Sequence, residues 1–134
     1  MSLLESCLTL AIISTVSAIA IPGLRQASRS YLLTSAASDV ATRVQSARIN
    51  AVIRNCDCRL SVTSSAQYIV ECENPGWTTL ETATLPANIT ISANARPEFH
   101  PRGNVAPAGT VTLWNSAGSE KQIIVNIAGR IRIQ

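Results

Sequence analysis

The first 24 residues decide the fold, and they read Met1-Ser-Leu-Leu-Glu5-Ser-Cys-Leu-Thr-Leu-Ala-Ile-Ile-Ser-Thr-Val-Ser-Ala-Ile-Ala-Ile-Pro22-Gly-Leu24. From Ser6 to Leu24 the chain carries no charge and is rich in Leu, Ile, Val and Ala. A helix of about 19 residues is roughly 28 Å long, close to the thickness of the hydrocarbon core of a bilayer. Glu5 stands near the start of this helix, where an anion is favourable to the helix dipole. We therefore predict an apolar N-terminal helix, with the rest of the chain forming a soluble domain attached to its C-terminal end.

Three classes of N-terminal segment could have this composition. A secretory signal peptide requires Lys or Arg before its apolar core, and residues 1–5 contain neither. An ordinary membrane anchor is compatible with Arg25 and Arg29, which follow the run, but rarely has Glu at its start. The third class is the type IV pilin N-terminus, which the stretch resembles because that segment has Glu at residue 5 and Pro at residue 22 of the mature chain. Glu5 and Pro22 match both positions.

The resemblance to pilins implies an assembly mechanism and a location. Pilins lose a short leader and are methylated at the new N-terminus, so we expect this sequence to be the mature chain, with Met1 at a position that is usually Phe. Met1, Glu5 and Pro22 are the expected assembly residues: the Glu5 carboxylate would pair with the N-terminal amine of a neighbouring subunit and so set the axial register. The alternative for Glu5 is a position facing headgroups and water. We expect an inner-membrane protein that joins copies of itself or other pilins in a helical filament, extracellular or periplasmic.

The helical pattern continues after Pro22, which we expect to kink the helix without ending it. Apolar residues recur mostly three or four positions apart, as on one face of a helix; they are Leu24, Ala27, Tyr31, Val40, Val44, Ala47 and Ala51. Asn55 can end the helix, so one helix is predicted from about Ser2 to Arg54, on the order of 80 Å long. Its first half is uniformly apolar and its second half is amphipathic.

After Asn55 the apolar period changes from 3.6 to 2, which is typical of strands. The predicted strands are 58–62, 67–72, 77–85, 89–92, a short one near Phe99, 110–114, 121–127 and 130–133. We predict an α+β fold, with a long N-terminal helix, kinked near Pro22, packed on a C-terminal antiparallel domain resembling a β-sandwich. The expected divisions are residues 1–24 as membrane anchor or filament core, 25–55 as the amphipathic half-helix, and 56–134 as the β-rich domain.

Three of the four cysteines fall in the predicted β-domain. If the first hairpin turns about Ser65, facing residues sum to 130, and Cys58 lies opposite Cys72. A disulfide there would close a loop of about 15 residues and contribute roughly 3 kcal/mol. A slip of the hairpin would bring Cys56 to the same place, so that pairing stays open. Cys7 is expected to act as a small apolar side chain, and no metal site is expected.

A second resemblance lies near the C-terminus. It consists of Pro101-Arg-Gly103, then Gly109-Thr-Val-Thr-Leu113, then a strand and Gly129-Arg-Ile-Arg-Ile133. This pattern is similar to the GspH/FimT family of minor pilins and pseudopilins, which serve type IV pili or type II secretion. In the FimT branch a Gly-Arg-x-Arg tail is implicated in DNA uptake, and that motif falls on Gly129, Arg130 and Arg132.

Arg130 and Arg132 are two apart on a predicted strand, so both should project from one face and could contact phosphates without reading sequence. Arg102 and Lys121 would extend this surface if the fold brought them near. The alternative is a solvated strand edge with protective charges. The net charge of +3 is too small to imply a nucleic-acid partner by itself.

No catalytic motif is present. The single histidine, His100, stands in a predicted loop, and there is neither a nucleophile–His–Asp arrangement nor a glycine-rich phosphate loop. We predict a protein that is not an enzyme and needs no cofactor. The two hypotheses are a structural subunit of a type IV pilus or related filament, and a minor pilin that binds DNA for uptake. Within the first, the alternatives are a minor component, a type II secretion pseudopilin and the major repeating protein.

Overall fold

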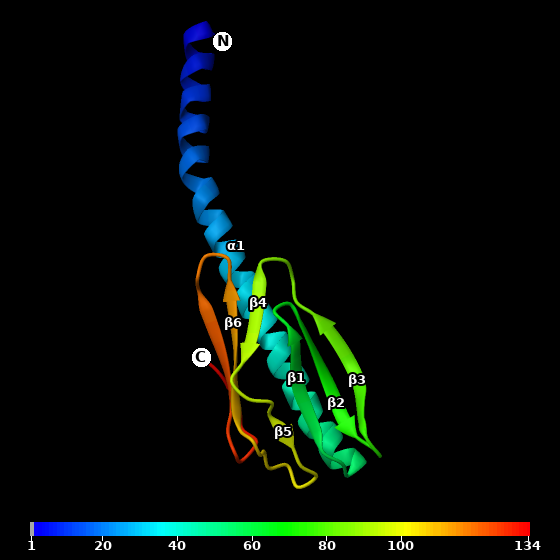
Figure 1. The fold of residues 1–134 in the computed structure, drawn as a ribbon. Helices are drawn as coiled ribbons and strands as arrows, with labels where there is room; N and C mark the ends of the chain where they lie inside the picture. Colours follow the sequence, from blue (N-terminus) through cyan, green and yellow to red (C-terminus); the bar gives the residue numbers. More distant parts are fainter. Residues whose placement is uncertain (1) are drawn as a thin grey trace.

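A computed structural model describes residues 2–134 (Figure 1). Its longest element is α1, a single helix Leu3–Arg54 of 52 residues, about 78 Å long. The helix ends at Asn55, whose backbone is left-handed with φ 52° and ψ 45°; asparagine adopts this conformation more readily than other side chains do. Pro22 lies inside α1 without ending it, and the axis changes direction between the apolar part and the domain (Figure 1). The predicted helix and its kink are confirmed.

The domain covers only the second part of α1. The buried residues of the helix are Leu33, Ala36, Ala37, Val40, Val44, Ala47 and Ala51. Leu24, Ala27 and Tyr31, which the periodicity placed on the same packed face, are exposed. That part of the prediction is wrong, because a periodic pattern identifies a helix face but not how far the covering sheets extend along it. Residues 24–32 therefore lie outside the core, between the apolar run and the domain.

Two antiparallel sheets pack on α1. The first has the order β3-β2-β1-β5 and the second the order β4-β6-β7-β8. Their strands are β1 Cys58–Ser64, β2 Gln67–Glu73, β3 Trp77–Thr84, β4 Ile89–Ala93, β5 Glu98–Phe99, β6 Gly109–Asn115, β7 Glu120–Val125 and β8 Ile131–Ile133. Figure 1 shows α1 running behind both sheets, and it contacts strands of each. The predicted α+β class and two-sheet arrangement are confirmed.

The core lies between the helix and the inner faces of the sheets. In β6, buried and half-buried residues alternate without exception, which is the period of 2 from which the strand was predicted. The largest fully buried side chains include Tyr68, Phe99, Leu60, Leu113 and Ile123, and both sheets contribute to them. Several strands begin or end slightly away from the predicted bounds. The difference matters at β8, which begins at Ile131, so Arg130 lies before the strand and not in it.

The β1–β2 hairpin has the register that the cysteine arithmetic requires. Cys58 lies opposite Cys72 and Leu60 lies opposite Val70, and each of these pairs sums to 130. A disulfide joins Cys58 to Cys72 across the two strands. Cys56 is a free, half-buried thiol beside this bond, and Cys7 is free and exposed on α1. The pairing predicted from the hairpin is therefore the one the structure contains.

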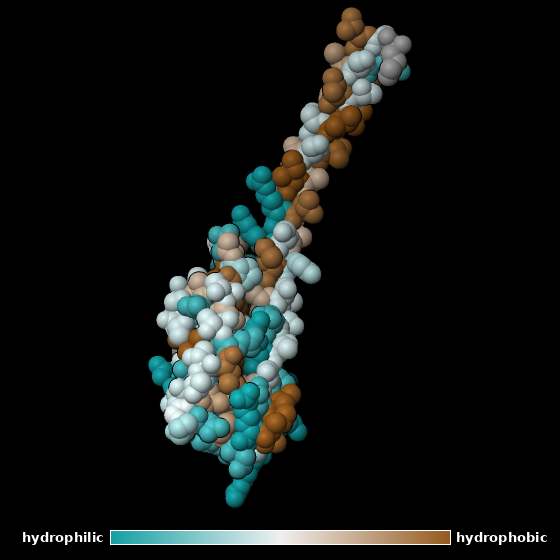
Figure 2. Space-filling model, turned by 90° about the vertical axis from the view of Figure 1, so that its right-hand side faces the viewer, coloured by the Kyte–Doolittle hydropathy of each residue, from teal (hydrophilic) through white to brown (hydrophobic). Residues whose placement is uncertain are grey.

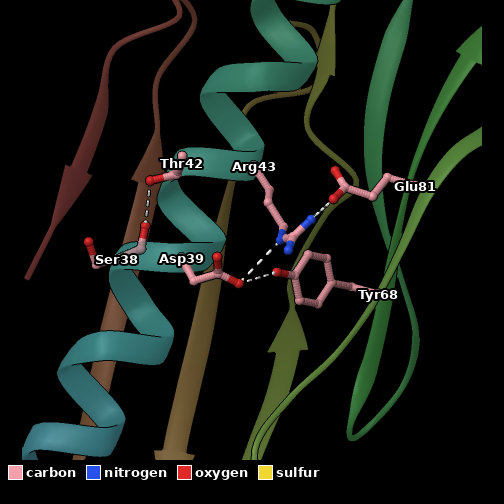
Figure 3. Close-up of polar contacts among 6 residues, drawn as sticks. All are labelled: Ser38, Asp39, Thr42, Arg43, Tyr68 and Glu81. Atoms are coloured by element: carbon pink, nitrogen blue, oxygen red, sulfur yellow. Dashed lines mark hydrogen bonds and ion pairs between the residues drawn. The ribbon is translucent and has the colours of Figure 1, made fainter.

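A polar network attaches α1 to the first sheet. Figure 3 shows Arg43 reaching from the helix between Asp39 and Glu81. Its Nε donates to Oδ2 of Asp39 at 3.2 Å, and its guanidinium pairs with the Glu81 carboxylate on β3. The Tyr68 hydroxyl donates to the same Asp39 oxygen at 3.3 Å. Burial, and then the Asp39 carboxylate, raise the pKa of Tyr68 well above its usual range, so the hydroxyl remains a donor.

We expect the disulfide to stabilise the domain by limiting the unfolded chain. Replacing both cysteines in a Cys58→Ala/Cys72→Ala variant should lower the free energy of unfolding by about 3 kcal/mol, as the chain-entropy relation gives for a loop of this size. Urea unfolding of the full chain in detergent, followed by tryptophan fluorescence, measures this difference.

The control is Cys56→Ser, which leaves the bond intact and should change the free energy of unfolding by less than about 1 kcal/mol. A loss in Cys56→Ser as large as in the double variant would show that Cys56 takes part in the bridge.

Candidate functional site

No residue in the apolar part of α1 is buried in the described chain. Its large side chains are strongly exposed, including Leu3, Leu8, Ile13, Val16 and Ile19. Figure 2 shows many hydrophobic side chains, interspersed with paler ones, along the helix that projects from the domain. By length and composition α1 could span a membrane. Such a surface is unfavourable in water and requires either lipid or other apolar helices around it.

The hydroxyl groups within this apolar part bond to the helix's own carbonyls. Thr9 donates to the carbonyl of Ser6 at 2.9 Å, and Ser17 donates to that of Ile13 at 2.8 Å. Ser14 and Thr15 donate in the same way. Because these donors are satisfied inside the helix, no hydroxyl hydrogen needs a partner from water. The polar residues of residues 6–24 are therefore compatible with burial in an apolar environment.

Glu5 stands in the first turn of α1, next to the N-cap. The Ser2 hydroxyl accepts a hydrogen bond from the Glu5 backbone N–H at 3.3 Å. Ser followed by Glu three residues later is the capping-box sequence, a signal that the sequence reading passed over. The Glu5 side chain is exposed and thus available to another subunit. Met1, the other predicted N-terminal assembly residue, lies outside the described residues.

The two family motifs near the C-terminus meet in space. Gly103 and Gly129 have φ of 84° and 76°, and both lie against the Arg48 side chain of α1. A Cβ added at Gly129 would overlap the carbonyl oxygen of Gly103. Only glycine combines a positive φ with so close a backbone approach. The contact thus requires glycine at Gly129, whereas at Gly103 only the positive φ favours glycine, because an added Cβ would meet Arg48 at an ordinary distance of 3.6 Å.

Three arginines line one cavity at this contact. Arg130 and Arg132 lie beside Arg48, at a cavity of about 480 Å³ that Gln45 and Asn126 also line. Asn126 fixes the turn, because its Oδ1 accepts the Arg130 N–H at 2.9 Å. Within residues 2–134 none of the three guanidiniums pairs with a carboxylate.

The structure therefore brings together the two arginines that the sequence singled out. It joins them to Arg48 of the helix, rather than to Arg102 or Lys121, which do not line the cavity. The sequence offers no signal for Arg48, because its position depends on how the β7–β8 turn folds back onto α1. Three cations without an acid between them form a surface suited to a polyanion or a phosphate.

Among residues 2–134, two groups of side chains have ligand atoms close enough to hold a metal ion. In one, Asp57, Glu98 and His100 come together, and Nδ1 of His100 lies 2.7 Å from Oδ1 of Asp57. The Asp57–His100 hydrogen bond accounts for that contact without an ion, and 43 residues separate its partners, so sequence reasoning missed it. The other group consists of Cys56, Cys58 and Cys72. Because the disulfide joins Cys58 to Cys72, only the thiol of Cys56 is left as a ligand for a metal ion.

Comparison with known proteins decides the family. The sequence profile of the family described as type II transport protein GspH matches residues 36–129, more than half of the chain. The chain belongs to the GspH family. The match begins in the packed part of α1 and ends at Gly129, just before the two arginines. No curated protein matches the sequence.

Solved structures show the same fold. The minor pseudopilin EpsH from the type 2 secretion system of Vibrio cholerae is 11% identical, covers 76% of this chain and 95% of its own length, and has a TM-score of 0.67. The type IV minor pilin FimU of Pseudomonas aeruginosa is 17% identical, with coverages of 76% and 92% and a TM-score of 0.64. Family and fold together show a GspH-family chain with the fold of these minor pseudopilins and minor pilins.

The contact between the two glycines can be tested by substitution. Gly129→Ala introduces both an unfavourable φ and an overlap with Gly103, so we expect it to lower the free energy of unfolding by more than about 2 kcal/mol. Gly118→Ala is the matched control, because Gly118 has a similar positive φ, 83° against 76° for Gly129, with nothing within 4 Å of the added Cβ.

In the control we expect the free energy of unfolding to fall by about 1 kcal/mol, the cost of the positive φ alone. Urea unfolding of the two full-length variants measures the difference between them. Equal losses would mean that the Gly103–Gly129 approach contributes nothing beyond the conformation of the turn.

Proposed function

We propose that this protein is a minor subunit of a type IV pilin-like filament, held in the inner membrane by α1 before assembly and buried through the same residues afterwards. The observation that carries the proposal is the part of α1 before Leu33, which leaves the domain, exposes its apolar side chains on all sides and satisfies its own hydroxyls. Both a bilayer and a bundle of parallel apolar helices would cover that surface. The description of the matched family favours the type II secretion pseudopilus over a type IV pilus.

In this proposal Glu5 sets the position of each subunit along the filament. A carboxylate within an apolar bundle costs several kcal/mol unless a cation compensates it. The N-terminal amine of a neighbouring subunit is a cation that every copy supplies. Pairing of the two groups would therefore fix the displacement between neighbouring subunits along the filament axis. The apolar side chains around them could pack at many different displacements.

The test is the variant Glu5→Gln, which removes the charge but keeps a side chain suited to the capping box. We expect its incorporation into filaments to fall at least tenfold, because the neutral amide cannot compensate the amine. Subunits in filaments sheared from producing cells are quantified by mass spectrometry. Membrane insertion and disulfide formation should be unchanged.

Glu73→Gln is the matched control: it removes one exposed carboxylate from β2 and should assemble as the parent does. Normal incorporation of Glu5→Gln would overturn the role of Glu5.

A second candidate function rests on the arginine cavity at Arg48, Arg130 and Arg132. In this alternative the subunit also binds DNA through its phosphates, without reading sequence. Because phosphate contacts release counterions, the logarithm of the binding constant should fall with the logarithm of salt concentration by about 0.9 for each contact made to duplex DNA.

The variant Arg130→Gln/Arg132→Gln should reduce that salt slope by about 1.8 and leave filament incorporation unchanged. Arg54→Gln/Arg96→Gln removes the same charge from exposed positions elsewhere and serves as control. Fluorescence anisotropy of labelled DNA, titrated with the full chain in detergent at several salt concentrations, gives both slopes. Equal slopes for the two variants would reject the cavity as a DNA site.

A further inference from the structure

Arg25 and Arg29 are the first charged side chains after Glu5, and the assembly mechanism does not use them. They are four residues apart on α1 and so share one face of the helix. Both are exposed, and within residues 2–134 neither pairs with a carboxylate. Two guanidiniums on one helix face can bind an anion, and no carboxylate within residues 2–134 pairs with them.

The pair lies at a cavity between α1 and the turn that joins β6 to β7. The cavity has a volume of about 500 Å³, and Ile21 and Pro22 line it together with the two arginines. Across from the helix, the lining comes from Asn115 at the end of β6 and from Ser119 in the turn. The turn is held in shape by Asn115, whose Oδ1 accepts the backbone N–H groups of Ala117 and Ser119 at 3.0 and 2.9 Å. The cavity thus combines an apolar end, two cations and neutral polar groups.

The height of this cavity follows from the helix rise. If the apolar run ends at Leu24 at the edge of the hydrocarbon core, Arg25 lies about 1.5 Å and Arg29 about 7.5 Å beyond that edge. The headgroup layer on each side of a bilayer is roughly 5–7 Å thick. Both guanidiniums therefore reach the level of the lipid phosphates. Figure 2 shows hydrophilic side chains projecting from the helix at this junction.

Arg25 and Arg29 lie on the side of the membrane where such cations are unusual. With the domain outside the cytoplasm, Arg25 and Arg29 flank the membrane on the side where cations next to spans are less frequent. A guanidinium binds phosphate oxygens through two parallel N–H donors, and the hydroxyl and amide groups of the turn suit a hydroxylated headgroup. At this depth Ile21 and Pro22 would lie beside the glycerol backbone and acyl chains of the bound lipid.

We propose that this cavity binds the headgroup of an anionic phospholipid, with Arg25 and Arg29 on its phosphate, in the membrane-held state of the subunit. The inference rests on the proposed function, because only an inserted helix brings the cavity to the bilayer surface. The phosphate chemistry is shared with free inorganic phosphate, so the test includes both.

The test uses the full chain in nanodiscs of phosphatidylcholine with one fifth phosphatidylglycerol. After mild extraction, native mass spectrometry counts the lipids that remain bound. We expect phosphatidylglycerol to be retained over phosphatidylcholine, and Arg25→Gln/Arg29→Gln to reduce this preference about 30-fold, since one cation near an anionic leaflet contributes roughly fivefold. Millimolar inorganic phosphate, added to the same samples, should not displace the lipid.

Two further variants distinguish lipid binding in the cavity from a general effect of the protein's positive charge. Arg96→Gln/Arg102→Gln removes the same charge on either side of β5, at the end of the domain away from the apolar helix (Figure 1), and should retain the lipid as the parent does. Ala117→Trp fills the cavity from the turn and leaves both arginines in place, so it should lose the lipid. Retention in Ala117→Trp would reduce the site to a diffuse surface charge and overturn the proposal.

The remaining outcomes distinguish the two proposals. A parent chain that alkaline carbonate extracts from membranes would overturn the proposed function and the lipid site with it. A parent chain that inserts but retains the two lipids equally would overturn the lipid site alone. Displacement by inorganic phosphate would likewise overturn it in favour of a free anion. An arginine double variant that retains lipid normally but fails to assemble would assign the pair to an acidic group of a neighbouring subunit.

Discussion

The packing of one stripe of α1 between two sheets is the constraint on which the rest of the structure depends. Four of the seven buried helix residues are alanines, and their small side chains allow strands of both sheets to approach the helix axis. Alanine also has the highest helix propensity, so the stripe favours the helix and the close approach together. The β-domain has no complete core without residues 33–51, which agrees with a family match that begins at Ala36.

Two arginines border this stripe and attach it to different sheets. At about 100° per residue, Arg43 lies on one side of the stripe and Arg48 on the other. Arg43 pairs with Glu81 on β3 of the first sheet, whereas Arg48 lies against the Gly103 and Gly129 turns next to the second. Together they fix the rotation of α1 about its own axis relative to the domain. On the proposed function, the same rotation determines which apolar side chains before Leu33 face a neighbouring subunit.

Local patterns were enough to predict most of the fold. The change of period at Asn55 indicated where the helix ends and the strands begin, and counting across the first hairpin placed Cys58 opposite Cys72. The Ser2–Glu5 capping box was equally readable, since it depends on residues three apart. Contacts such as Arg48 with Gly129, or Asp57 with His100, depend on how the sheets fold over the helix. No local pattern carries that information, and for the same reason the exposure of Leu24, Ala27 and Tyr31 was missed.

The position of the weakest stretch of α1 also follows from this arrangement. Pro22 removes one helical hydrogen bond, and Gly23 next to it has low helix propensity. Nothing lies within 4 Å of the position that a Gly23 side chain would occupy, and the first buried helix residue is Leu33. Bending at residues 22–23 therefore redirects the apolar part without disturbing the alanine stripe or the contacts of Arg43 and Arg48. On the proposed function, a subunit built in this way can keep one rigid domain while its apolar helix adapts first to a bilayer and then to a bundle of helices.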